Sequence, residues 1–111
     1  MDVGVEIRRA VDSGKVLIGY RECEKNVLKG IGRLLIVSKQ FENKKIEKLK
    51  HIANVAGIPF MQFEGSPAEL GAICGRPHTV STMLVLEEGK SKIVEIHKRG
   101  EKSKKKQANA K

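Results

Sequence analysis

The hydrophobic and polar positions of this 111-residue chain follow two spacings that alternate along its length. Apolar residues recur every three or four positions in 3–11, again after Gly19, and a third time in 43–56, which is the spacing of amphipathic helices. Between these segments lie unbroken apolar runs at 16–18 and 33–38. An unbroken run bounded by turn residues is typical of a strand covered on both faces, so helices are expected to flank these strands.

Residues with special roles at helix ends define several boundaries. Asn43 is expected to cap the third helix and Gly57 to end it. The segment SPAE, 66–69, has a serine at the expected cap position and a proline at the first helical position. A glutamate follows three residues after the serine, and this pattern predicts a capping box. The short fourth helix that follows should end at Gly75.

Three further strands complete the predicted pattern. They are expected at 59–63, at 79–86 and, as an edge strand, at 92–97. Because helices and strands alternate for most of the length, the predicted fold class is α/β, a three-layer α/β/α sandwich with a small mixed sheet. A chain of this length has room for one core, so we expect a single domain, residues 1–97, and a separate tail.

Charge is unevenly distributed and separates the tail from the folded body. The chain has 22 Lys and Arg against 13 Asp and Glu, a net charge of +9. Residues 98–111 hold seven of these basic residues, one acidic residue and too few apolar side chains to pack, so we expect a basic flexible tail. Such a segment either keeps a protein soluble or lies on a polyanion, namely a nucleic acid or an anionic membrane.

Signals for export or membrane insertion are not found in the sequence. No apolar run approaches the roughly 20 residues that span a bilayer, and the N-terminal segment does not resemble a signal peptide. We therefore expect a soluble cytoplasmic protein. Cys23 and Cys74 are then expected to be reduced thiols that fill small spaces in the core.

Patterns that would indicate catalysis or metal binding are weak. His51 and His97 have no cysteine or serine partner that the sequence can pair with them, and Cys74 and His78 would need two further ligands to hold a metal. The GIG at 30–32 precedes a strand, whereas a phosphate-cradling loop follows one. We expect no enzyme activity, no metal and no cofactor. A small enzyme or nucleotide-binding α/β module with a basic arm is the alternative.

Ligands of α/β sheets bind beyond the carboxyl ends of strands. Three loops are expected to reach one such end of the sheet. GYRECEK, 19–25, and SKQ, 38–40, each follow a strand directly. GRPHT precedes the strand at 79–86 and reaches the same end only if that strand runs antiparallel.

The first of these loops suits RNA chemically. Gly19 lets another backbone approach closely, and the start of a helix favours phosphate. Arg21 and Lys25 lie four residues apart on one helix face and can bind phosphates, while Glu22 can accept hydrogen bonds from guanine N–H groups. The alternative is a solvated helix start whose charges only suit the helix dipole.

Several segments resemble a known family. The chain resembles archaeal-type large-subunit members of the kink-turn RNA-binding ribosomal protein superfamily. The segments that carry the resemblance are GYRECEK, LLIVS, GIPFMQFEG and above all SPAELGAICGRPHTVSTMLV. The resemblance runs from about residue 3 to 97 and leaves out the tail. It implies a three-layer α/β/α domain without catalytic activity or cofactor, bound to a kink-turn of large-subunit ribosomal RNA among other ribosomal proteins.

The resemblance also implies which residues contact RNA. The positions that match the three RNA-binding loops of the superfamily are Gly19, Tyr20, Arg21, Glu22, Lys25, Ser38, Lys39, Gln40, Arg76, Pro77, His78, Thr79 and Val80. The superfamily motif has an asparagine where this chain has Arg21, whose guanidinium can still bind phosphate or stack on a base.

In the third loop, Pro77 to Val80 would form a partly apolar wall beneath extruded bases, and Arg76 would supply charge. A kink-turn-binding subunit of another ribonucleoprotein, such as a small ribonucleoprotein or ribonuclease P, is the alternative assignment.

Overall fold

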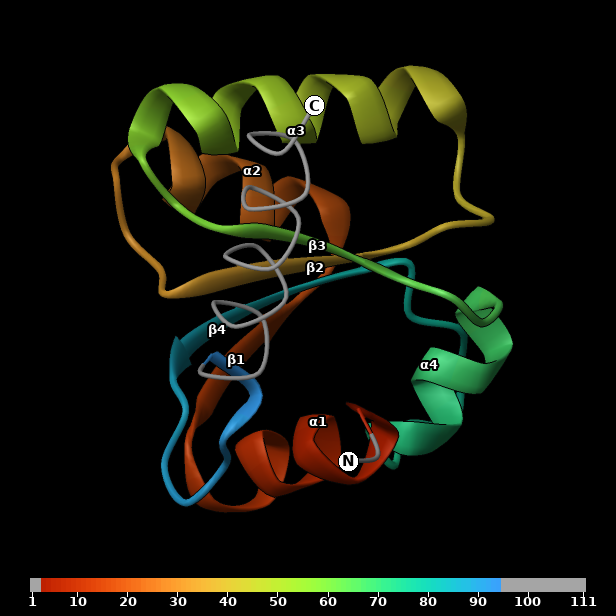
Figure 1. The fold of residues 1–111 in the computed structure, drawn as a ribbon. Helices are drawn as coiled ribbons and strands as arrows, with labels where there is room; N and C mark the ends of the chain where they lie inside the picture. The colour runs from red at the N-terminus through yellow and green to blue at the C-terminus, as the bar shows by residue number, and fades with distance from the viewer. Residues whose placement is uncertain (1–2, 95–111) are drawn as a thin grey trace, which may run out of the picture.

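Helices and strands alternate along residues 3–94, the part of the chain that this computed structural model describes (Figure 1). In chain order, the elements are α1 (Val3–Ser13), β1 (Lys15–Ile18), α2 (Tyr20–Leu28), β2 (Leu34–Ser38), α3 (Asn43–Ala56), β3 (Phe60–Phe63), α4 (Pro67–Ile73) and β4 (Thr82–Glu87). None of the described helices is long and apolar enough to cross a membrane. The predicted tail, 98–111, lies outside the described residues.

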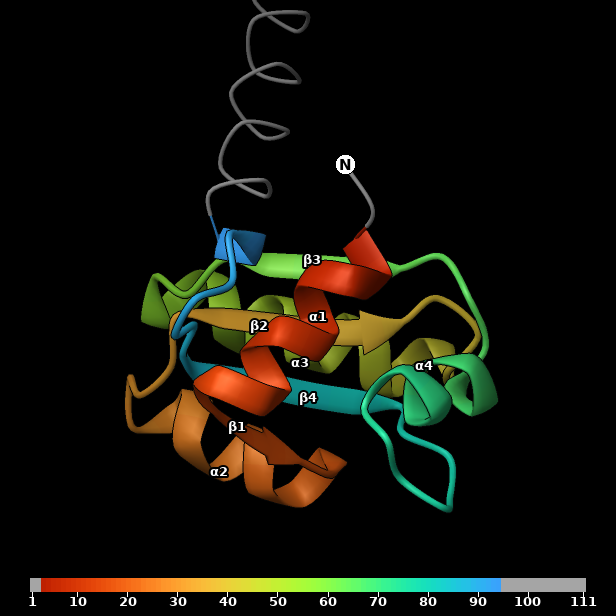
Figure 2. The same cartoon turned by 90° about the horizontal axis from the view of Figure 1, so that it is seen from below.

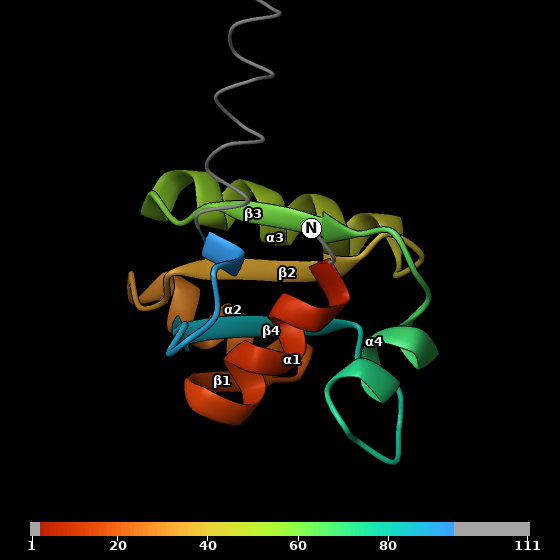
Figure 3. The same cartoon turned by 60° about the horizontal axis from the view of Figure 1, so that its bottom comes forward.

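The strands form one mixed sheet in the order β1-β4-β2-β3 (Figure 3). β2 and β3 are parallel, whereas β4 lies between β1 and β2 and runs antiparallel to both. The register places Ile18 opposite Met83 and Val37 opposite Thr82. The antiparallel direction that the third loop needed is therefore confirmed.

Helices cover both faces of the sheet, with α1 and α4 on one face and α2 and α3 on the other (Figure 2). The residues of β2 are all buried and alternate between two cores. Leu34 and Ile36 belong to the core under α1 and α4, whereas Leu35 and Val37 belong to the core under α2 and α3. The three-layer α/β/α sandwich is confirmed, and burial on both faces explains why 34–37 contains no polar residue.

Two predicted helix-end signals are observed and one is displaced. The Ser66 hydroxyl accepts a hydrogen bond from the Glu69 N–H (3.2 Å), and Gly57 ends α3 in the left-handed conformation with a φ of 75°. The prediction for Asn43 is wrong, because it is the first helical residue of α3 and not its cap. The helix begins earlier than expected, since the Glu42 carbonyl already accepts a helical hydrogen bond (2.9 Å).

The strand predicted at 92–97 is wrong where the structure describes that segment. Residues 93–94 are helical, and 95–97 lie outside the described residues. The Ser91 hydroxyl accepts a hydrogen bond from the N–H of Ile93, the first helical residue (3.1 Å). This bond turns the chain away from the extended conformation that a strand requires.

Glu6 in α1 is a buried charge that ties the end of the described chain to the body. Its side chain is 3% exposed and accepts hydrogen bonds from the Lys92 N–H (2.8 Å) and the Arg9 guanidinium (2.9 Å). The Ser91 hydroxyl donates to the Glu6 carbonyl (2.6 Å). The Lys92 amide, aided by Arg9, outweighs the effect of burial and lowers the pKa of the Glu6 carboxyl. The sequence showed no signal for this contact, whose partners lie 86 residues apart.

Replacing Glu6→Gln should destabilise the protein at neutral pH and reduce its sensitivity to acid. A carboxyl whose pKa is lowered on folding stabilises the native state above its unfolded pKa of about 4.3, and this contribution is lost as the pH falls through the lower folded value. Urea unfolding between pH 7 and pH 3 should therefore show a steeper loss of stability for the wild type than for the variant.

The matched control is Asp12→Asn, which removes a carboxylate from an exposed ion pair with Arg8 on the same helix. Exposed pairs contribute about 0–1 kcal/mol, so this variant should stay close to the wild type. Equal pH slopes for the wild type and Glu6→Gln would contradict a stabilising role for the ionised Glu6 carboxylate.

Candidate nucleic-acid interface

The three predicted loops meet at one end of the sheet, at the right of Figure 1. Two backbone hydrogen bonds join the first two loops to the residues at which the third loop leads into β4. The Gly19 N–H donates to the Thr82 carbonyl (3.0 Å), and the Ser38 N–H donates to the Ser81 carbonyl (2.8 Å). These bonds form because antiparallel β4 begins beside the residues at which β1 and β2 end. The expected meeting of the loops is therefore confirmed.

The first loop is open at Gly19 and charged along the helix that follows. Gly19 has φ 115° and ψ 140°, a conformation that side chains disfavour, and a Cβ at this position would meet no atom within 4 Å. The side chains of Arg21, Glu22 and Lys25 are exposed, and within the described chain none of them forms an ion pair or a hydrogen bond. These groups are therefore available to a ligand that contacts the exposed face of α2, from its first turn, which contains Glu22, to its last, which contains Lys25.

The second loop is held from inside by Ser38. This residue is buried; its hydroxyl donates to the Gly65 carbonyl (2.9 Å) and accepts from the Gln40 N–H (3.2 Å). Lys39 is exposed and pairs with the carboxylate of Glu64 (3.3 Å). Of the three predicted contact residues in this loop, only Gln40 is both exposed and without a side-chain partner in the described structure.

The third loop lies directly against α4. Its exposed residues are Arg76, Pro77, His78 and Thr79. Val80 is buried in the core, and its N–H donates to the Pro67 carbonyl (2.9 Å), so it anchors the loop and is not part of an exposed wall. Gly71 in α4 makes this packing possible, because a Cβ there would overlap the carbonyl oxygen of His78. Sequence analysis did not single out Gly71, although a glycine within a helix often marks close packing.

An aromatic cluster joins the first loop to the start of α3. The rings of Tyr20 and Phe41 lie 5.9 Å apart at a tilted angle, and the Lys45 ammonium lies 5.2 Å from the Tyr20 ring and 5.5 Å from the Phe41 ring. Burial, with Glu24 beside it, raises the pKa of the Tyr20 hydroxyl. Tyr20 was predicted as a contact residue, whereas Phe41 and Lys45 were missed because their role depends on how α2 and α3 pack.

The described residues offer little for nucleophilic or metal chemistry. Burial raises the pKa of the Cys23 thiol to about 12 and also raises the pKa of Cys74, so neither readily forms the reactive thiolate. In residues 3–94 there is no group of three or more His, Cys, Asp and Glu side chains that could hold a metal ion.

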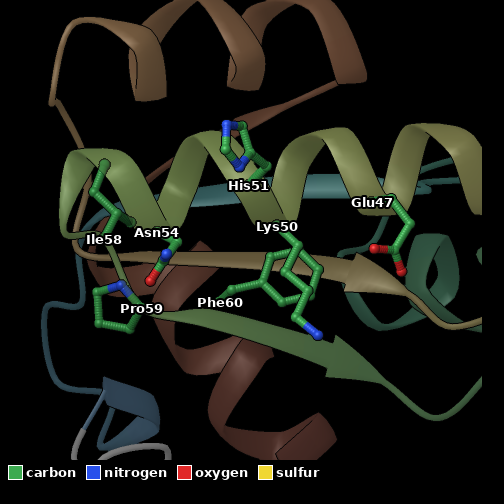
Figure 4. Close-up of a pocket in the computed structure, with 7 residues that line it drawn as sticks. All are labelled: Glu47, Lys50, His51, Asn54, Ile58, Pro59 and Phe60. Atoms are coloured by element: carbon green, nitrogen blue, oxygen red, sulfur yellow. The ribbon is translucent and has the colours of Figure 1, made fainter.

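A hollow of about 430 Å³ between α3 and the start of β3 lies away from the three loops. Its lining residues are Glu47, Lys50, His51, Asn54, Ile58, Pro59 and Phe60 (Figure 4). Lys50 lies beside the Phe60 ring, while His51 points away from it, toward α2. His51 has no cysteine or serine beside it in this lining and shows no catalytic arrangement.

Comparison with known proteins identifies related sequences over almost the whole described region. A family model described as the ribosomal protein L7Ae/L30e/S12e/Gadd45 family matches residues 1–95. The large ribosomal subunit protein eL30 of Methanocaldococcus jannaschii is 41% identical over 96 residues, which cover 86% of this chain and 87% of that protein. The proteins of the same name from Pyrobaculum calidifontis and Methanobrevibacter smithii are 36% and 38% identical, and the match covers 86% of this chain and 95% and 96% of those proteins.

Substituting Gly71→Ala should destabilise the third loop, although alanine is the better helix former. The added methyl group overlaps the His78 carbonyl, and forcing an extra carbon into a packed contact costs about 1–3 kcal/mol. Urea unfolding measures this loss, and hydrogen exchange at the Val80 N–H measures the local opening. Ala68→Ser, at an exposed position of the same helix, should change stability by less than about 0.5 kcal/mol. A rise in stability for Gly71→Ala would show that helix propensity dominates.

Proposed function

The chain belongs to the ribosomal protein L7Ae/L30e/S12e/Gadd45 family, and on this basis we propose that it is a structural constituent of the large ribosomal subunit. It is not an enzyme, as the relatives named as ribosomal proteins indicate. Its proposed RNA ligand is a kink-turn, a helix-internal loop-helix element, in large-subunit ribosomal RNA. Its proposed location is the cytoplasmic ribosome, with other ribosomal proteins as neighbours.

One observation carries the proposal for RNA binding. The first two loops are hydrogen-bonded to Ser81 and Thr82, where the third loop leads into β4, so loops that lie far apart in the sequence meet at a single end of the sheet. The exposed side chains gathered there form no ion pair or side-chain hydrogen bond within the described structure; they are the charged residues Arg21, Glu22, Lys25 and Arg76 and the amide Gln40. Cationic groups supply phosphate binding, and the carboxylate and amide supply hydrogen bonds to base edges.

Within the first loop, the proposed roles follow from position. Gly19 has no side chain and lies beside open space, so the RNA backbone can approach it closely. Lys25 binds a phosphate, and Glu22 accepts hydrogen bonds from a guanine. Arg21 either binds a phosphate or stacks on a base, because its flat guanidinium can do both.

In the other two loops, exposure divides the predicted residues into contacts and supports. Ser38 and Val80 are buried and hold their loops in shape. Gln40 and the exposed residues 76–79 are the proposed contacts, with Pro77 offering an apolar surface to an extruded base. Lys39 can reach RNA only by exchanging its carboxylate partner, Glu64, for a phosphate.

We also propose that residues 1–97 form the RNA-binding domain and that 98–111 act as a basic arm. The positive charge of this segment suits ribosomal RNA.

Filter binding to a kink-turn RNA and to an unkinked duplex of equal length, at matched salt, tests the shape-specific part of the proposal. The kink-turn should bind more tightly, and equal affinities would exclude shape recognition. Sedimentation in sucrose gradients tests the particle. The protein should sediment with large subunits, and its presence only in smaller particles would favour another ribonucleoprotein.

Lys25→Ala should weaken kink-turn binding and lower the slope of log affinity against log salt by about one unit, because one phosphate contact is lost. Lys90→Ala is the matched control. Lys90 is exposed in the turn that follows β4, at the opposite end of the sheet, and its loss changes the net charge equally. Equal slopes for the two variants would mean that Lys25 acts only through overall charge.

Glu22→Ala should reduce discrimination against RNA in which the contacted guanine is replaced, by about 1–3 kcal/mol, since a base-specific pair is lost. Affinity for each RNA should be measured at one salt concentration. Glu47→Ala removes an exposed carboxylate from α3, outside the loops, and should leave the discrimination unchanged. A Glu22→Ala variant that binds both RNAs more tightly, with the same ratio, would show simple charge repulsion and not base recognition.

A further inference from the structure

A second surface lies at the C-terminal ends of α2 and α3. Leu28 is 65% exposed and Val55 is 74% exposed. They line a groove of about 460 Å³ between the two helices. The complete lining is Leu28, Lys29, Gly30, His51, Ile52, Val55 and Ala56. We call this surface the α2/α3 groove.

The α2/α3 groove faces away from the candidate RNA interface. α2 and α3 both begin at the end of the sheet where the three loops meet, and both run back along it. Their C-terminal ends therefore lie at the opposite end, at the left of Figure 1. RNA held by the three loops leaves this groove uncovered.

Among the described residues, one lysine and no carboxylate line the α2/α3 groove. This lysine, Lys29, forms no ion pair within the described chain. His51 separates the groove from the adjoining hollow, to which Lys50 and Glu47 contribute opposite charges. An apolar floor with a basic rim is complementary to an apolar side chain that is flanked by acidic residues.

Three other occupants fit less well. Unpaired RNA bases stack on aromatic rings or guanidinium planes, and the one such ring in this lining is the imidazole of His51; the rest of the apolar lining is aliphatic. A second copy of the chain would bring two surfaces of the same sign together. The basic residues 98–111 of the chain itself also carry the wrong sign for this rim.

We propose that the α2/α3 groove docks a segment of another protein of the same particle, with an apolar side chain between Leu28 and Val55 and an Asp or Glu beside Lys29. This inference rests on the proposed function. It makes the protein a connector, with RNA at one end of the sheet and a protein at the other.

Photo-crosslinking in assembled particles tests the groove directly. The full chain carries p-benzoylphenylalanine at position 55, is assembled into large subunits in cells, and is irradiated in the purified subunits. The expected product is a crosslink to one protein, mapped by mass spectrometry to an apolar residue with an Asp or Glu within a few positions. The matched control carries the same group at position 5, because Val5 is an exposed apolar residue on α1, on the other face of the sheet, and is 46% exposed.

Substitution of the same residues gives a second measurement. Val55→Ser should increase release of the protein from large subunits in a salt wash by about tenfold, the loss expected for one apolar side chain at the centre of an interface. Its affinity for the isolated kink-turn RNA should equal that of the wild type, which also shows that the variant is folded. Val5→Ser should show neither effect.

The outcomes separate this inference from the function on which it rests. A crosslink from position 55 to ribosomal RNA or to a second copy, or no crosslink, would overturn the protein-docking proposal while the wild type remains in the subunit. Release of Val55→Ser at the wild-type rate would do the same. A wild-type protein absent from large subunits would overturn the proposed function, and the docking proposal with it.

Discussion

The hydrogen bonds that hold antiparallel β4 between β1 and β2 are the constraint on which the rest of the structure depends. β4 contributes to both cores, with Met83 and Val85 on one side and Leu84 on the other. Its direction also decides where the third loop lies. A parallel strand in the same place would begin at the far end of the sheet, and the loop that precedes it would lie there too. The candidate RNA interface thus depends on the pairing of one strand.

The same topology separates two kinds of chemistry. Exposed charged groups that form no ion pair within the described chain gather at the end where α2 and α3 begin, and the exposed apolar residues Leu28 and Val55 lie where these helices finish. Helices that follow strands must run back along the sheet, so their two ends are presented to different neighbours. A single layer of two helices can in this way serve both an RNA and a protein contact.

Local patterns predicted most of the secondary structure because the forces behind them are local. Helical spacing, the Ser66 cap and the apolar run 34–37 were all sufficient to define elements that the structure contains. The errors arose where distant residues supplied the hydrogen bonds. The β-branched pattern at 92–97 suggested a strand, but 93–94 are helical, the Ser91 hydroxyl accepts the Ile93 N–H, and Glu6, far away in the sequence, accepts the Lys92 N–H.

The candidate interface shows the same division. The sequence by itself determined the α/β alternation, the positions of the three loops along the chain and the kinds of side chain in them, because these follow from residue order and residue chemistry. Only the tertiary structure decided that Ser38 and Val80 are buried supports and that Lys39 already has Glu64 as a partner. It alone also placed Gly71 beneath His78 and Phe41 beside Tyr20. Whether a side chain is buried or paired depends on which elements pack together, and the residue type at a single position does not show this.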